Sequence, residues 1–221
     1  MIIDNGQLFY CPFPIPHSPM KQYAPATQRN REPILEVLKQ FLPKNGAILE
    51  ISSGTGEHCV YFAPHFPQCD WIPTDISEVA MDSISAWTEE SGHENIQKPM
   101  RVDVTQPQWY QSFLEKNVRA IACINMIHIA PWDACIGLME GSGHILSNRD
   151  LLYLYGPYKR QNQHTAPSNQ EFDQYLQNQN SAWGVRNLET VAEVAKKNQL
   201  HLTEIIEMPS NNLSLIFQKQ C

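Results

Sequence analysis

The fold is decided by one stretch of the chain, which reads Ile48-Leu49-Glu50-Ile51-Ser52-Ser53-Gly54-Thr55-Gly56-Glu57-His58. Residues 47–51 are short, apolar and suited to a buried strand, and two glycines then allow unusual backbone dihedrals and the close approach of a ligand. Helical spacing resumes at Glu57. A strand, a tight loop and a helix in this order place backbone N–H groups beside the loop, so we expect a nucleotide-type cofactor there.

The spacing within this loop distinguishes two kinds of cofactor site. The dinucleotide fingerprint G-x-G-x-x-G has a third glycine that lets helix and strand pack closely, but Cys59 stands at that position here. The acid Glu50 instead opens a pattern that resembles motif I of class I S-adenosylmethionine-dependent methyltransferases, acid-x-Gly-x-Gly-x-Gly, with Ser52 replacing the first glycine. Glycine-rich loops recur by chance, so this motif alone does not identify the cofactor.

Two later acids also follow apolar segments. Asp75 ends the predicted strand 69–75, where a carboxylate can accept both hydroxyl hydrogens of a ribose, and this spacing suits either cofactor class. Alternatively, Asp75 only caps the helix predicted near Ser77. Asp103, followed by Val104, ends a third apolar unit and matches the acid that methyltransferases direct at the adenine amino group. A dinucleotide enzyme needs only the second of these three acids.

Composition favours one compact enzyme. With 221 residues, 42% of them hydrophobic, the chain can bury the core of a single α/β domain over residues 1–221, and no linker or charge run divides it. The net charge of −7 provides no basic field, so we expect a small-molecule substrate and no nucleic acid.

The cysteines and the hydropathy pattern predict a soluble protein of the reducing cytosol. No C-x-x-C pair occurs, which argues against a structural zinc, and several cysteines lie in apolar runs. No stretch approaches roughly 18 uninterrupted apolar residues and no basic leader is present, so we expect neither a membrane span nor a signal peptide. The six cysteines are Cys11, Cys59, Cys69, Cys123, Cys135 and Cys221.

Strands and helices alternate along the rest of the chain. An amphipathic helix is predicted over 33–42, with Pro33 in its first turn. The other predicted helices are 78–90, 107–116, 131–145 and 188–197, and the other strands are 102–104, 120–127, 151–155, 201–207 and 213–218. The closing hairpin is unlike a regular βα repeat. This order resembles the sheet of class I methyltransferases, and the resemblance implies a Rossmann-like fold, a seven-stranded mostly parallel sheet with an antiparallel last strand and helices on both faces.

Nearly the whole chain resembles the methyltransferase-like protein 26 family, whose bacterial members are described as a domain of unknown function with a methyltransferase fold. The resemblance rests on segments 23–35, 53–58, 155–158 and 208–212. It implies S-adenosylmethionine as cofactor and leaves the reaction unassigned. It implies that Glu50, Gly54 and Gly56 surround the methionine part, Asp75 binds ribose, Ile76 contacts adenine and Asp103 lies at the adenine edge. Ser52, Val104 and Asn125 are further candidate cofactor contacts.

Two residues upstream complete the predicted cofactor pocket. The guanidinium of Arg29 can pair with the methionine carboxylate while Asn30 satisfies its remaining donors or acceptors. Alternatively, Asn30 caps the following helix and Arg29 is solvated. Tyr23, in the N-terminal arm 1–32, is a candidate cover for the pocket, or packs without touching a ligand.

The end of the fourth predicted strand should face the methyl acceptor. Asn125 and His128 lie there, and His128 is the best candidate for a catalytic base because an unperturbed histidine titrates near pH 6.5. Alternatively, His128 bonds a loop or packs on Trp132. Methyl transfer can also proceed without a base, because the sulfonium is already activated and alignment supplies most of the acceleration.

Residues 157–186 form an insertion that we expect to be a lid over the acceptor. A short helix is predicted over 168–178, with Phe172, Tyr175 and Leu176 in the core. Tyr158 is a further catalytic candidate, and we expect Tyr155, Trp183 and Asn212 to contact the substrate.

The sequence therefore predicts an S-adenosylmethionine-dependent methyltransferase that acts directly on a small molecule without a metal. Two alternatives stay open: a catalytically silent cofactor-binding protein that acts through a partner, and, less favoured, a nicotinamide-dependent oxidoreductase. The acceptor, its nucleophilic atom and the oligomeric state are not encoded in any motif that we recognise.

Overall fold

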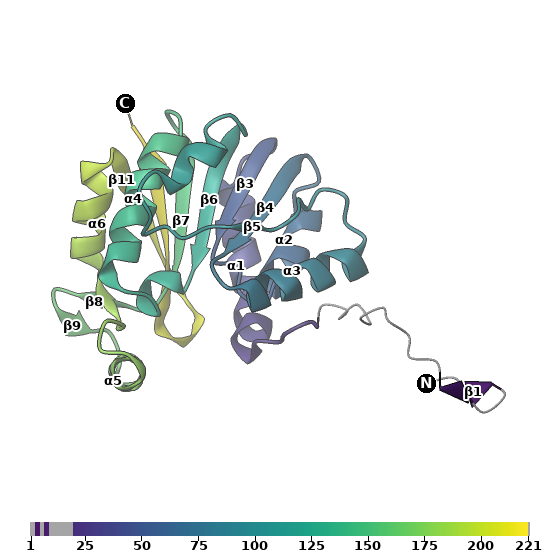
Figure 1. Cartoon of the computed structure of the whole chain (residues 1–221). Coiled ribbons are helices and arrows are strands. Elements are labelled where there is room, and N and C mark those ends of the chain that lie inside the picture. The colour runs from purple at the N-terminus through teal and green to yellow at the C-terminus, as the bar shows by residue number, and fades with distance from the viewer. Residues whose placement is uncertain (1–2, 5–6, 9–19, 221) are drawn as a thin grey trace.

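A seven-stranded sheet forms the centre of the computed structural model, which describes residues 3–4, 7–8 and 20–220 (Figure 1). Its strands are β3 (Gly46–Ile51), β4 (Cys69–Asp75), β5 (Met100–Arg101), β6 (Val118–Ile124), β7 (Leu151–Gly156), β11 (Leu200–Met208) and β12 (Asn212–Lys219). Their order in space is β11-β12-β7-β6-β3-β4-β5. Neighbours are parallel except β12, which is antiparallel to both β7 and β11. The predicted sheet is confirmed.

Helices cover both faces of this sheet. They are α1 (Pro25–Phe41), α2 (Glu57–Phe62), α3 (Glu78–Ser91), α4 (Trp132–Ile145) and α6 (Leu188–Lys197), with 3-10 turns η1 (Ala63–His65), η2 (Trp109–Phe113), η3 (Met126–His128) and η4 (Pro209–Asn211). Successive strand residues point to opposite faces. In β3, Ile48 packs in the core cluster of α1 and α2, whereas Leu49 packs in the cluster of α4 and α6. Burial on both faces explains the continuous apolar run of this strand.

The first helix begins earlier than predicted. α1 starts at Pro25 rather than Pro33, so Pro33 lies inside it and the N-terminal arm does not extend to residue 32. Pro25 occupies the first turn, where a missing N–H costs nothing, and the side chain of Glu57 accepts the N–H of Ala24 at 2.6 Å. Both signals lie outside the apolar pattern of residues 34–42, so the pattern alone places the start too late.

The segment after α3 is less regular than predicted. The strand at 102–104 is replaced by the two-residue β5, and the helix at 107–116 is reduced to η2. The Asp103 carboxylate accepts the N–H and hydroxyl of Thr105, at 2.9 and 2.6 Å, and an amide hydrogen of Gln106. These local bonds compete with the sheet ladder and turn the chain just after β5.

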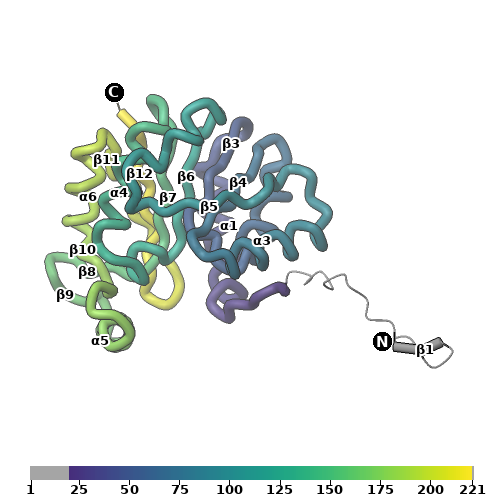
Figure 2. The backbone as a smooth tube through the Cα atoms, in the orientation of Figure 1, coloured from purple at the N-terminus to yellow at the C-terminus, as the bar shows by residue number. Residues whose placement is uncertain are grey.

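The insertion is an ordered unit below the main sheet (Figure 2). Its strands β8 (Tyr158–Arg160), β9 (Gln163–His164) and β10 (Arg186–Asn187) form a small sheet ordered β10-β8-β9, and α5 (Pro167–Gln179) confirms the predicted helix. Leu176 is buried as expected. Phe172 and Tyr175 are 39% and 58% exposed, so their assignment to the core is wrong.

Near the N-terminus, β1 (Ile3–Asp4) pairs antiparallel with β2 (Gln7–Leu8). Cys11 and Cys221, and most of the predicted N-terminal arm, lie outside the described residues. Among the residues that are described, no helix combines the length and apolar character needed to cross a bilayer.

Candidate functional site

The loop after β3 contains three residues in the left-handed region. Ser52, Gly54 and Gly56 have φ of 56, 58 and 88°. At Gly56 a side chain is excluded, because a Cβ atom would lie 2.8 Å from the Cα of Ile84 in α3, whereas at Gly54 no atom lies within 4 Å. Ser52 adopts the conformation of the glycine that it replaces, which costs an L-residue about 1–2 kcal/mol. Because no atom lies near the position of a Cβ at Gly54, there is open space above the loop at that residue.

Asp75 ties the end of β4 to this loop. Its Oδ2 accepts the N–H of Gly54 at 3.0 Å and its Oδ1 accepts the N–H of Ser77 at 2.9 Å. The carboxylate has about four lone-pair positions, so two remain for hydroxyl groups of a ligand. The next residue, Ile76, is 49% exposed and offers an apolar surface for a flat ring. Asp75 does not cap α3, because Ser77 is the N-cap residue.

Glu50 was predicted to contact the methionine part of the cofactor, but its side chain is buried. It is 2% exposed, and its Oε2 accepts the indole N–H of Trp71 at 2.8 Å. Burial raises the pKa of Glu50 to about 7, although the Trp71 bond opposes this shift. Glu50 is therefore a buried brace between β3 and β4 beneath the loop.

Asp103, the acid predicted to end the third strand, is only partly available to a ligand. Asp103 borders a shallow cavity with Met100, Arg101 and Val102, next to the end of β5. Burial raises the pKa of Asp103, but bonds to Thr105 and Gln106 outweigh it and lower the pKa overall. Val104 is buried in the core cluster that contains α4, so its side chain is not the predicted cofactor contact.

A larger cavity of about 660 Å³ opens where α1, α5 and the ends of β6, β7 and β12 meet. Its lining includes five of the residues singled out from sequence, Arg29, Asn30, Asn125, Tyr155 and Asn212. The remaining lining residues are Ala26, Pro33, Ile129, Pro157, Ser168, Asn169, Phe172, Pro209 and Ser210. The structure thus brings residues of distant segments into one site.

Asn30 joins this cavity to the glycine loop. Its Oδ1 lies 2.9 Å from Nε2 of His58, which follows the loop in α2. Burial, assisted by Arg31, lowers the pKa of His58 to about 4, so the neutral ring donates its N–H to Asn30. Asn30 lies within α1, so the alternative that it caps a helix is wrong. Its amide hydrogens are left for Tyr155 and the cavity, consistent with a hydrogen-bonding effect of Asn30 on the Tyr155 pKa.

His128 and Tyr158 are not placed to act as catalytic groups. Both are fully buried at 0% exposure, and their rings contact edge to face at 5.1 Å. Burial lowers the pKa of His128 to about 3, and the Nε2 atom lies so close to Gly156 that a Cβ there would be 2.4 Å away. Burial raises the pKa of Tyr158 well above its usual range. Their burial argues against both predictions, His128 as the base and Tyr158 as a catalytic residue.

Tyr23 and Trp183 also lie outside the cavity lining. Tyr23 packs edge to face on Trp87 of α3 at 5.2 Å, which favours the packing alternative. Trp183 is half-buried in the loop after α5, where its backbone N–H donates to the carbonyl of Asn180. Neither side chain lines this cavity.

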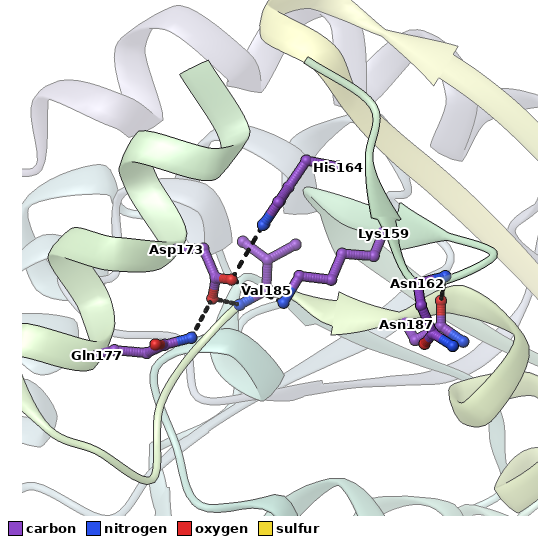
Figure 3. Close-up of polar contacts among 7 residues, drawn as sticks. All are labelled: Lys159, Asn162, His164, Asp173, Gln177, Val185 and Asn187. Carbon is purple, nitrogen blue, oxygen red and sulfur yellow. Dashed lines mark hydrogen bonds and ion pairs between the residues drawn. The ribbon is translucent and has the colours of Figure 1, made fainter. Parts of the chain in front are cut away.

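A buried carboxylate joins the helix and the strands of the insertion to one another (Figure 3). Asp173 of α5 lies 2.7 Å from Nζ of Lys159 in β8 and 3.2 Å from Nε2 of His164 in β9, and it accepts the N–H of Val185 at 2.8 Å. Burial opposes ionisation of Asp173, but these partners outweigh it and lower its pKa. The anchored helix presents Phe172 to the cavity.

Sequence reasoning missed several cavity residues. Phe172 was assigned to the core from its helical spacing, and Ile129, which is 46% exposed, carries no motif. Exposed apolar side chains inside a polar lining are the structural signal of a ligand wall. Ser168 and Asn169 are positioned through bonds with Asn211 in the β11–β12 turn, which connect segments far apart in sequence.

Comparisons with known proteins identify the fold. A sequence model described as "Protein of unknown function (DUF938)" matches residues 21–219. An O-methyltransferase family protein from Burkholderia thailandensis superposes with a TM-score of 0.74 at 11% identity, covering 88% of this chain and 57% of that chain. Human N-acetylserotonin methyltransferase in complex with SAM gives 0.72 at 12% identity, covering 89% and 53%. This chain thus spans little more than half the length of these two proteins, and the similarity shows the class I methyltransferase fold.

Proposed function

Because this chain belongs to the DUF938 family of proteins of unknown function, we propose its function from its own site. It is an S-adenosylmethionine-dependent methyltransferase whose acceptor is a small molecule. One observation carries the proposal: Asp75 holds the open Gly54 loop at the sheet edge, and Asn30 and His58 connect that loop to a cavity large enough for a second ligand.

The residues at the sheet edge fit this cofactor. Asp75 has free lone pairs for the ribose hydroxyls, the exposed side chain of Ile76 can cover one face of adenine, and the absence of a Cβ at Gly54 leaves room for the chain of the cofactor. Arg29 and Asn125 at the cavity end would hold the methionine carboxylate and amine. Asp103 at the end of β5 would bind the adenine edge.

Direct methyl transfer depends more on the orientation of the acceptor than on a side chain that moves a proton. When bound, S-adenosylmethionine supplies an activated methyl group on its sulfonium. The cavity residues align the acceptor against that methyl and limit access of water, which are the contributions that a static, preorganised site can make. No group of three or more metal-binding side chains occurs within the described part of the chain, and our proposal uses no metal.

Other parts of the proposal extend the sequence predictions. The net charge of −7 favours a small molecule over nucleic acid as acceptor. Cys59, Cys69, Cys123 and Cys135 are free thiols, which is in keeping with a reducing, cytosolic setting. Membership of the methyltransferase-like protein 26 family stays a proposal that rests on the sequence resemblance.

Calorimetry with S-adenosylhomocysteine tests the cofactor assignment. We expect one site per chain with an affinity in the micromolar range, and no heat with NAD. Absence of binding by both S-adenosylmethionine and S-adenosylhomocysteine would refute the proposal, and binding of NAD alone would favour the oxidoreductase. Cofactor binding without methyl transfer to any of a broad acceptor panel, together with a stable protein partner, would favour the catalytically silent alternative.

A further inference from the structure

The cavity beside the loop has an unbalanced charge. Among the described residues that line it, the exposed Arg29 is the one charged side chain and none is a carboxylate. Within residues 20–220, Arg29 forms no ion pair. An unpaired guanidinium next to polar donors is suited to an anionic ligand, because its planar fork of N–H groups matches carboxylate geometry.

Asn30 is an asparagine of this lining that keeps donors for a ligand, whereas Asn169 and Asn212 donate their amide hydrogens to other protein groups. The Oδ1 of Asn30 is occupied by His58, so its amide hydrogens remain available. Phe172 and Ile129, 39% and 46% exposed, supply apolar walls. The lining therefore suits a molecule with one anionic end and an apolar body.

Among the described residues, no side chain in this lining is suited to act as a general base near neutral pH. Tyr155 and Arg29 are its titratable members, and burial raises the pKa of Tyr155 despite bonds from Asn30 and Asn212. His128, at the end of β6, is enclosed by the Tyr158 ring, Gly156 and the loop whose Ile127 carbonyl accepts the Arg186 side chain. An acceptor that arrives with its nucleophilic atom already deprotonated needs no base from these side chains.

The net charge of the cofactor also favours an anionic acceptor. S-adenosylmethionine has a sulfonium, an ammonium and a carboxylate, so it adds one net positive charge to that of Arg29. If Arg29 pairs with the methionine carboxylate, the sulfonium and ammonium still lack an anion. If Arg29 stays free, it binds the acceptor directly. In both arrangements the site favours an anionic acceptor.

We propose that the acceptor is a small carboxylic acid with an apolar body, methylated on its carboxylate oxygen; this rests on the proposed function. The carboxylate oxygen forms a bond to the methyl carbon as the bond between that carbon and the sulfonium sulfur breaks. The products are a neutral methyl ester and a neutral thioether, and no proton moves. Because opposite charges are lost together, the step leaves no new charge for the site to stabilise.

Binding of benzoate and its neutral isostere benzamide tests the charge preference. NMR signals of Ile129 and of the Asn212 side chain report on the cavity, with and without S-adenosylhomocysteine. We expect benzoate to bind on the order of tenfold more tightly than benzamide, and Arg29→Gln to remove most of this difference. Lys39→Gln is the matched control, because Lys39 is an exposed cation on the same helix that pairs only with Glu36.

Transfer from methyl-labelled S-adenosylmethionine to a pool of aryl and alkyl monocarboxylates tests the reaction. We expect label in products that mild base hydrolyses to methanol, as esters do and ethers and methylamines do not. Equal binding of benzoate and benzamide, label only in base-stable products from a parallel pool of amines and phenols, or bound cofactor with no labelled ester would each overturn the inference. Loss of cofactor binding would instead defeat the proposed function, while the benzoate comparison without cofactor still measures the charge preference.

Discussion

Replacing Asp75 with alanine separates the two tasks that the structure gives this carboxylate. Asp75→Ala removes the acceptors of the Gly54 and Ser77 N–H groups, at 3.0 and 2.9 Å, and removes the proposed partner of the ribose hydroxyls. Asp70→Ala is the matched control, because Asp70 is an exposed carboxylate of the same strand that accepts one bond from Gln97.

The expected losses follow from hydrogen bonds to a charged group. Loss of the ribose bonds should weaken S-adenosylhomocysteine binding by about 1.5–3 kcal/mol, which is roughly a tenfold to 150-fold rise in Kd. Loss of the two backbone bonds should lower the free energy of unfolding by about 1–3 kcal/mol, because both N–H groups lie in a site that leaves Asp75 only 8% exposed.

Calorimetry and chemical denaturation measure these two quantities separately. Affinity is determined at a temperature where denaturation shows both variants to be folded, so that lost binding is not lost structure. An unchanged Kd in Asp75→Ala, or an equal weakening in Asp70→Ala, would refute the assignment of Asp75 to the ribose. An unchanged stability would refute its role in holding the loop.

Three further predictions test the surrounding structure. Gly56→Ala should lower the free energy of unfolding by about 2–4 kcal/mol and Gly54→Ala by about 1 kcal/mol, because only the first adds a clash to the left-handed strain; equal losses in denaturation would contradict this. The pKa of His128 is lowered to about 3, so its contribution to stability is complete above pH 6.5 and is lost as the pH falls toward 3. His128→Gln should remove up to about 1.4 kcal/mol per pH unit from that slope and leave the pH profile of methyl transfer unchanged, whereas a shifted profile would restore His128 as the base. Asp173→Asn should cost about 1–2 kcal/mol and increase hydrogen exchange in α5, since Lys159 is partly exposed; unaltered exchange would show that another contact anchors the helix.

Features encoded locally were predictable from sequence. The apolar run of β3, the glycines after it and the acid at the end of β4 lie within short windows, and the structure places them as expected. The start of α1 was not predictable in this way, because the Glu57 carboxylate that receives the Ala24 N–H comes from the following βα unit.

In the candidate site, too, local features were predictable from sequence and contacts between distant segments were not. The strand-end position of His128 was predictable, but the direction of its side chain depends on the left-handed Asn125 and on the bare Cα of Gly156, which lets the ring turn into the core. Phe172 lines the cavity because the insertion folds back beneath the sheet, where Asn169 of α5 bonds to Asn211 in the β11–β12 turn. No periodicity within α5 contains that information, so the helix could be predicted but not its role.

A crystal structure with S-adenosylhomocysteine bound tests the central claim most directly. The account predicts the ribose hydroxyls within hydrogen-bond distance of Asp75, and the sulfur directed toward the cavity lined by Arg29, Tyr155 and Asn212. A ribose bound elsewhere, or a sulfur directed away from that cavity, would contradict it.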